Sequence, residues 1–215
     1  RRTCRVSSLI GRRNPAALTL KTGHPAQGTL TLVVSRSMTI EFAHALIYVV
    51  DMDDMIDFYT DVLGFTVTDR APIAGEGSPE VAFLTSNPDH HHQFAFLQTR
   101  KESGDSNNLN HLAFRVGNLG IVKATIEALE ADGRATKLAP VTHGNAWSIY
   151  FTDPEGNGLE FFCDTPFHVG QPQATSWDPD LNEDELTAWT EETFGDNSRF
   201  GPIGDFYSSQ QELLA

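Results

Sequence analysis

Two histidines and one glutamate occupy positions at which their side chains could bind one metal ion. His44 lies in a β-rich run at residues 40–50, and His111 begins a similar run at residues 111–116. Glu160 stands between two apolar residues, where a carboxylate is costly unless it is paired or binds a metal. Two imidazoles and one carboxylate form the usual ligand set of non-haem Fe(II) and leave coordination positions open. We therefore predict an Fe(II) site at these residues, and Mn(II) suits the same ligands.

The elements around these three residues repeat along the chain. A strand, a helix and three further strands are expected in each copy, which gives the order β-α-β-β-β twice. One copy alone would bury too little apolar surface to be stable by itself. We predict an α+β fold in which two βαβββ modules form a curved mixed sheet around a metal-binding cleft. The expected strands are at residues 40–50, 65–70, 80–86 and 92–99 in the first copy, and at 111–116, 134–141, 146–152 and 158–163 in the second.

Each copy contains one expected helix with recognisable ends. Asp51 and Asn118 are suitable N-caps, and Gly64 and Gly133 are suitable left-handed stops. Apolar side chains recur at helical spacing in both segments and predict a buried stripe. These residues are Met52, Met55, Ile56, Tyr59, Val62 and Leu63 in the first helix, and Ile121, Val122, Thr125, Ile126 and Leu129 in the second.

Charge and composition divide the chain into four parts. Residues 1–37 contain seven basic residues and no acidic one, and we interpret them as a disordered extension, either an upstream segment or a transit-like leader. Residues 38–100 form the first module and residues 109–164 the second. Residues 165–215 form an acidic tail with a short helix expected at about 182–194.

The overall composition excludes several classes of partner. The 215 residues include 15 Lys and Arg against 29 Asp and Glu, a formal net charge of −14. Such a charge argues against nucleic acid and anionic membranes as main partners. No apolar stretch is long enough to cross a membrane. The two cysteines provide no disulfide framework, which predicts a cytoplasmic location. Pairing of exposed sheet edges could give a homo-oligomer.

Three segments resemble the vicinal oxygen chelate superfamily, and in particular the short, two-module type I extradiol ring-cleaving dioxygenases. The first is Asn-Pro-Asp-His-His-His-Gln-Phe-Ala-Phe at residues 87–96. The second is Thr-His-Gly-Asn at residues 142–145 with the run Trp-Ser-Ile-Tyr-Phe-Thr-Asp-Pro-Glu-Gly-Asn at 147–157. The third is Asp-Thr-Pro-Phe-His-Val-Gly-Gln-Pro at residues 164–172. The enzymes concerned are of the catechol 2,3-dioxygenase and 2,3-dihydroxybiphenyl dioxygenase kind.

The resemblance implies ring cleavage of a catechol-type substrate next to its hydroxyl pair, with Fe(II) and O2, as in aromatic hydrocarbon catabolism. Its iron ligands match His44, His111 and Glu160. Its histidine that acts on bound dioxygen matches His92, and His91 is the competing assignment.

The resemblance also implies two substrate-contacting residues. His143 matches the histidine that contacts a substrate hydroxyl, and Tyr150 matches the tyrosine that hydrogen-bonds the substrate. Four buried-type aromatics could line an apolar pocket or belong to the plain core: Phe94, Phe96, Trp147 and Phe161.

Two other functions are compatible with this ligand set or fold. A glyoxalase-like isomerase or a thiol transferase would be another metal-dependent enzyme of the same superfamily. A glyoxalase usually takes a fourth ligand from the last strand of its first module, and residues 92–99 contain no acidic residue. A metal-free small-molecule-binding protein of the same fold would lack His44, His111 and Glu160, so their presence counts against it.

Overall fold

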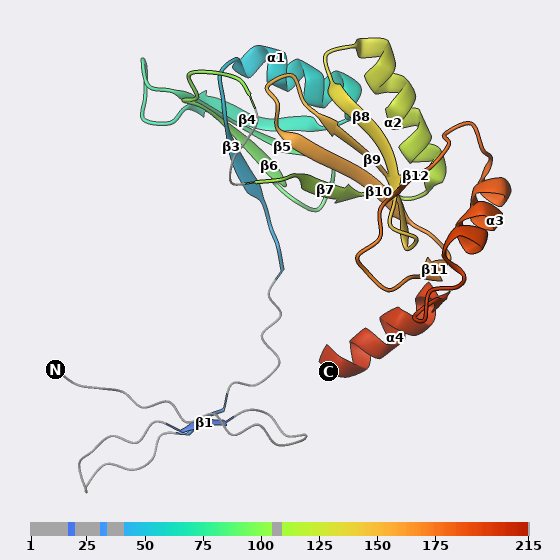
Figure 1. The fold of residues 1–215 in the computed structure, drawn as a ribbon. Helices are drawn as coiled ribbons and strands as arrows, with labels where there is room; N and C mark the ends of the chain where they lie inside the picture. The colour runs from blue at the N-terminus through green and yellow to red at the C-terminus, as the bar shows by residue number, and fades with distance from the viewer. Residues whose placement is uncertain (1–16, 20–30, 34–40, 105–108, 215) are drawn as a thin grey trace, which may run out of the picture. The chain divides into compact units, whose positions relative to one another are not determined.

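The computed structural model describes residues 17–19, 31–33, 41–104 and 109–214. The chain divides into one unit of residues 1–42 with 211–215 and another of residues 43–210. The predicted disordered extension, residues 1–37, falls mostly outside the described residues. Within it, β1 (Ala17–Thr19) pairs antiparallel with β2 (Thr31–Val33). The larger unit contains the two predicted modules (Figure 1).

The first module follows the predicted order. Its four strands form one sheet in the order β3-β6-β5-β4, where β3 runs parallel to β6 and the other pairs are antiparallel. The elements are β3 (Ala45–Val49), α1 (Met52–Asp57), the π-helical turn η1 (Phe58–Val62), β4 (Thr66–Pro72), β5 (Glu80–Thr85) and β6 (Phe94–Gln98).

The second module repeats this order, and a short fifth strand extends its sheet to β12-β8-β9-β10-β7. Here β7 runs parallel to β10, as β3 does to β6. The prediction of two βαβββ modules with an α+β fold is confirmed, and hydrogen bonding divides the strands between two sheets. The elements are β7 (Leu112–Arg115), α2 (Leu119–Asp132), β8 (Thr136–Thr142), β9 (Ala146–Thr152), β10 (Gly158–Asp164) and β12 (Thr175–Ser176).

The predicted helix ends are confirmed. The Asp51 carboxylate accepts from two amides of the first turn of α1, and the Asn118 side chain accepts from the Ile121 amide. Gly64 and Gly133 adopt φ values of 75° and 78°. Glycine has no Cβ to clash in this left-handed region, so the chain can turn directly from each helix into the next strand.

Both helices contribute to one continuous core, but one member of the predicted stripe is wrong. Ile121 is 44% exposed. The buried side of α2 instead begins at Leu119 and continues through Val122, Ile126 and Leu129. These positions recur every three or four residues, and Ile121 falls outside this stripe.

The C-terminal part is more structured than the single expected helix. The helix predicted at 182–194 is present as α3 (Glu183–Phe194), with a capping box between Asn182 and Glu185. A second helix, α4 (Ile203–Leu214), was not expected, and neither were β11 (Phe167–His168) and β13 (Gly201–Pro202). Across the described segments, the helices are too short or too polar to traverse a bilayer.

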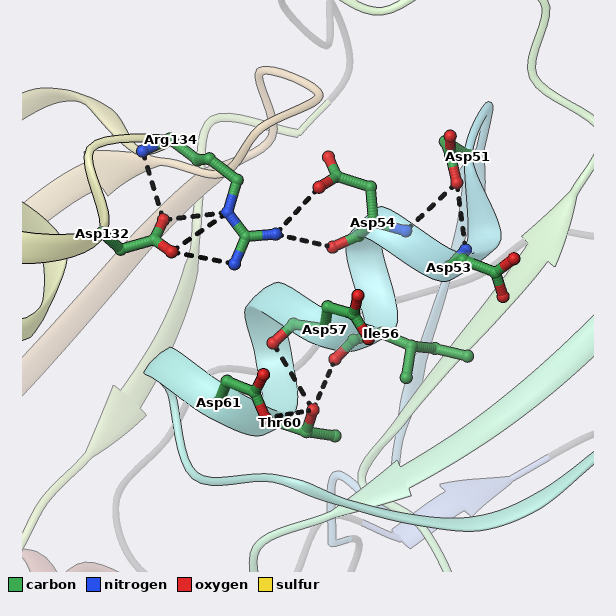
Figure 2. Close-up of polar contacts among 9 residues, drawn as sticks. All are labelled: Asp51, Asp53, Asp54, Ile56, Asp57, Thr60, Asp61, Asp132 and Arg134. Atoms are coloured by element: carbon green, nitrogen blue, oxygen red, sulfur yellow. Dashed lines mark hydrogen bonds and ion pairs between the residues drawn. The ribbon is translucent and has the colours of Figure 1, made fainter.

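Two polar contacts join the modules. The Glu155 carboxylate, in the turn between β9 and β10, accepts from the amides of Val50 and Asp51 at 2.7 and 2.8 Å. Arg134, just after α2, lies 2.8 Å from Asp54 Oδ1 of α1, and its other guanidinium nitrogens contact Asp132 (Figure 2). Both contacts tie the start of α1 to the second module.

Candidate functional site

The predicted ligand Glu160 lies on the side of β10 opposite the core. Successive side chains of a strand point to opposite faces, and the neighbouring Leu159 and Phe161 are part of the apolar core. Glu160 is directly paired with Tyr150 of β9, so the two side chains lie on the same face. Although Glu160 faces away from the core, it is only 6% exposed.

His111 lies beside this carboxylate at the start of β7. Its Nε2 is 3.1 Å from Glu160 Oε2, and its Nδ1 is 2.6 Å from Asn110 Oδ1. The close approach depends on Gly158, where a Cβ would lie 2.2 Å from the carbonyl oxygen of Asn110. Any larger residue at position 158 would push β7 away from β10 and separate the two predicted ligands.

This arrangement fits a shared cation. With Asn110 Oδ1 as acceptor, His111 donates through Nδ1, and its Nε2 then faces an acidic oxygen at 3.1 Å. Two electron-rich atoms at that distance require a proton or a metal ion between them. Two ligand atoms about 2.1 Å from one metal, in adjacent octahedral positions, are about 3 Å apart. His111 and Glu160 therefore have suitable chemistry and spacing for two ligands of one divalent ion.

Tyr150 and His143 extend this cluster. The Tyr150 hydroxyl lies 2.9 Å from His143 Nε2, and His143 Nδ1 hydrogen-bonds the backbone carbonyl of Gln173. The rings of His111 and Tyr150 are 5.1 Å apart in an edge contact. Burial, followed by the nearby Glu160 carboxylate, raises the pKa of Tyr150 well above its ordinary value. Four of the six predicted site residues thus lie together on the second sheet.

The other two predicted residues form a separate contact in the first module. The rings of His44 and His92 are 4.5 Å apart. Burial is the largest cause that lowers the pKa of His92, followed by the charges of His44 and His91. Within the parts of the chain that the structure describes, no three His, Cys, Asp or Glu residues are grouped so that they could hold a metal. His44 is therefore not brought together with His111 and Glu160.

The repeat shows why the first module contributes fewer ligands. Ala45 pairs with Phe94 as Leu112 pairs with Leu159, so Ala95 occupies the position that Glu160 has in the second module. The strand position of Tyr150 is taken by Phe83 in the same way. The first module therefore provides no carboxylate at the position equivalent to Glu160.

The four aromatics considered as pocket lining belong to the core. Each is at most 6% exposed. Because successive side chains of a strand alternate between its two faces, Phe161 points to the face opposite Glu160. The four are Phe94, Phe96, Trp147 and Phe161. A separate surface cavity of about 250 Å³ lies between α2 and residues 178–180 and contains none of the predicted site residues.

Three residues near the site were not predicted. Asn110 directly precedes His111, so its position as a second partner of the ring could have been suggested by sequence adjacency. Gln173 acts through its backbone carbonyl, which no residue pattern indicates. Asp69 contacts His91 at 2.8 Å across 22 residues of sequence, and this contact depends on strand pairing.

Comparison with known proteins gives two informative relatives. The chain is 28% identical to "Biphenyl-2,3-diol 1,2-dioxygenase 2" of Rhodococcus globerulus over 169 residues, which cover 71% of this chain and 84% of the relative. It is 24% identical to "Metapyrocatechase" of Pseudomonas sp. (strain CF600) over 140 residues, covering 64% of this chain and 44% of that relative. The predicted resemblance to dioxygenases of this kind is confirmed at these levels of identity.

Structural comparison shows the same fold. A solved glyoxylase/bleomycin resistance protein/dioxygenase domain from Frankia sp. EAN1pec matches with a TM-score of 0.50 and 19% identity, covering 59% of this chain and 98% of that domain. A family model matches residues 41–161, more than half of the 215-residue chain. With this match, the chain belongs to the Glyoxalase/Bleomycin resistance protein/Dioxygenase superfamily.

Proposed function

We propose that the protein is an extradiol dioxygenase that uses Fe(II) and O2 to cleave a catechol-type ring beside its hydroxyl pair. The observation that carries this proposal is the 3.1 Å approach of His111 Nε2 to Glu160 Oε2, next to the hydrogen-bonded pair of Tyr150 and His143. Relatives named as dioxygenases of diols support the choice of substrate. His111 and Glu160 could hold a metal that binds the two adjacent hydroxyls of a diol. Tyr150 and His143 lie beside them and could exchange protons with these hydroxyls.

In this proposal, His111 and Glu160 hold the metal, and His44 completes the ligand set when the metal binds. Such an ion would supply Lewis acidity that favours deprotonation of a substrate hydroxyl. Fe(II) is proposed because two imidazoles and one carboxylate suit it, and Mn(II) remains the alternative metal.

The protein groups would then control protons at the substrate. A neutral His143 donates through Nδ1–H to the Gln173 carbonyl, so its Nε2 is an acceptor. Tyr150 keeps its proton because its pKa is raised, and it donates to that nitrogen in the absence of substrate. A substrate hydroxyl beside this pair could pass its proton to His143 Nε2 while Tyr150 donates to the resulting oxygen. His92, beside His44, is proposed as the acid–base group on the dioxygen side.

The test is oxygen uptake by protein loaded anaerobically with Fe(II), using catechol, 2,3-dihydroxybiphenyl and protocatechuate as substrates. We expect O2 consumption and a yellow ring-opened product with at least one of them. Glu160→Gln should abolish both, whereas Glu130→Gln, an exposed change on α2, should not. Inertness of the metal-loaded protein toward all three diols would contradict the proposal. Isomerisation of a hemithioacetal by that inert protein would indicate a glyoxalase-like enzyme.

We also propose a cytoplasmic location and small-molecule partners. The net charge of −14 disfavours nucleic acid and anionic membranes. Cys163 is a buried free thiol, and burial raises its pKa to about 11, which suits a reducing compartment and an unreactive structural role. Fractionation of the producing cells tests this location.

A further inference from the structure

A chain of polar contacts in the first module leads to His92. The Asp69 carboxylate lies 2.8 Å from His91 Nε2, and His91 Nδ1 lies 2.9 Å from His92 Nδ1. The His92 ring in turn lies against His44. His91 and His92, the two candidates for the histidine that acts on dioxygen, are therefore in direct contact, and His91 lies between Asp69 and His92.

A β-bulge places Asp69 in this chain. The pairing of β4 with β5 shifts between Val67 and Asp69, so that Asp69 and not Thr68 pairs with Phe83. Asp69 therefore shares a strand face with Phe83, whose ring contacts both His91 and His92. Bulges commonly redirect a side chain beside an active site, and this one places the Asp69 carboxylate against the His91 ring.

The direction of each hydrogen bond follows from the carboxylate. An ionised Asp69 can only accept, so His91 must donate through Nε2. A neutral His91 then has a bare Nδ1, which accepts a hydrogen bond from His92 Nδ1–H. His92 is left with its proton on Nδ1 and a lone pair on Nε2. With one proton on each ring, this is the arrangement that satisfies both contacts.

We propose that Asp69 and His91 are positioning residues that hold neutral His92 with its proton on Nδ1 and its Nε2 free to accept. The side chains of His91 and Asp69 are 58% and 68% exposed, so their contact adds little to stability. Its effect is directional, because it sets which nitrogen of His92 is available. The catalytic consequence rests on the proposed function: His92 would accept a proton or hydrogen bond from a reactant through Nε2.

The first test concerns the tautomers themselves and needs no metal or substrate. Nitrogen-15-labelled histidine in the metal-free full chain is examined by NMR at a pH of about 8, where histidine with an ordinary pKa of about 6.5 is neutral. His91→Gln and His92→Gln identify the two rings. We expect the Nε2–H form for His91 and the Nδ1–H form for His92. An Nε2–H form of His92 in the wild type would overturn the proposal.

Asp69→Asn tests the origin of this arrangement. An amide can donate as well as accept, so it no longer dictates the direction of the His91 bond. His92 should then revert to the Nε2–H form that free imidazole side chains prefer. Asp61→Asn, which removes an exposed carboxylate from η1, should leave both rings as in the wild type. Identical spectra for Asp69→Asn and the wild type would also overturn the proposal.

Kinetics separate this inference from the proposed function. If the Fe(II) protein cleaves a diol, Asp69→Asn should lower kcat about tenfold, with KM and Fe(II) affinity unchanged. Asp69→Glu should restore most of kcat because it restores an accepting carboxylate. An unchanged kcat in Asp69→Asn would remove the catalytic role. If the wild type cleaves no diol, the proposed function fails, and the NMR result still decides whether Asp69 orients His92.

Discussion

The Tyr150 hydroxyl lies 2.9 Å from Nε2 of His143, whose other ring nitrogen is bonded to the backbone carbonyl of Gln173. Because a carbonyl only accepts, a neutral His143 ring carries its proton on Nδ1, so its Nε2 accepts and Tyr150 is the donor. The raised pKa of Tyr150 keeps the proton on the phenol at all ordinary pH values. The pair is thus already oriented to take up a proton at His143.

Tyr150→Phe should lower activity while leaving the fold intact. The ring remains, but the donor to His143 is lost, and we expect kcat to fall by about 10²-fold, as for other acid–base groups. Diol-dependent O2 uptake measures this, with Tyr207→Phe as the control because Tyr207 bonds Asp164 and has no contact with His143. Equal kcat values for the wild type and Tyr150→Phe would show that the hydroxyl takes no part in the reaction.

His111→Ala and His44→Ala distinguish a preformed ligand from one recruited by the metal. His111 already lies beside Glu160, whereas His44 contacts His92. We expect both variants to bind Mn(II) at least about tenfold more weakly than the wild type, measured by calorimetry under conditions that avoid oxidation. Wild-type affinity in His44→Ala alone would exclude that residue from the ligand set and leave a two-residue site.

Tyr59→Phe should destabilise the protein more at neutral than at acidic pH. The Tyr59 hydroxyl donates to Asp153 Oδ2 at 3.1 Å, and burial raises the pKa of this carboxyl group while the bond from Tyr59 partly lowers it. With a raised folded-state pKa, the contribution of Asp153 is fully present below the unfolded value of about 3.9 and is lost as the pH rises through the folded value. Without the hydroxyl this loss is larger.

Urea unfolding over a pH series measures that effect. The difference in unfolding free energy between the wild type and Tyr59→Phe should be small near pH 4 and reach about 1–3 kcal/mol at neutral pH. Tyr48→Phe is the control because Tyr48 is exposed. A difference that shrinks as the pH rises would contradict the assignment of Tyr59 as a donor to ionised Asp153.

Arg134→Lys should weaken the contact between the modules. The guanidinium bridges Asp132 and Asp54 and lies over the Phe58 ring, 5.4 Å from its centroid. An ammonium cannot reproduce this planar arrangement. Because these groups are partly exposed, we expect a loss of about 1 kcal/mol in unfolding free energy. The loss should decrease at about 1 M salt, where the Debye length is about 3 Å; a salt-independent loss would indicate packing and not charge.

Glu155→Gln should be costlier than other changes of an acid to its amide. The carboxylate is 5% exposed and accepts from the amides of Val50 and Asp51. A glutamine would present an NH2 group toward one of these donors, which should cost about 1–3 kcal/mol. Thermal and urea unfolding measure this against Glu130→Gln, an exposed change. Equal stability of the two variants would show that the buried contact adds nothing.

Local signals in the sequence predicted much of the fold. The caps at Asp51 and Asn118 and the stops at Gly64 and Gly133 depend on residues adjacent in sequence, and the structure contains all four. The repeat was recognisable because each module has the same order of elements. By contrast, α4 was not predicted, although Ile203, Phe206 and Tyr207 recur at helical spacing within it.

The site could be predicted in part. Glu160 stood out because it is a charged residue between apolar neighbours, and its closeness to His111 follows from the pairing of β10 with β7. The side of the strand to which Phe94 and Trp147 point was open from composition alone. Strand alternation assigns both to the core.

Other features depend on geometry that residue types do not encode. The bulge that redirects Asp69 is a change of one residue in strand pairing, and no local pattern in β4 reveals it. The segment from Asp153 to Asn157 connects the two strands predicted at residues 146–152 and 158–163. Its second role, in which Glu155 binds backbone amides more than 100 residues earlier in sequence, depends on the tertiary fold.

The Glu155 contact also bears on how a duplicated architecture can be divided. Each repeat contains its own helix and strands, yet the amides that begin the first helix are completed by a side chain encoded in the other repeat. If the two modules were produced as separate polypeptides, the first would contain the Val50 and Asp51 amides without their acceptor, and the second would contain the Glu155 carboxylate without its donors. They should recover native structure when mixed and be less stable apart, because each half needs the other to satisfy the polar groups at the start of the first helix.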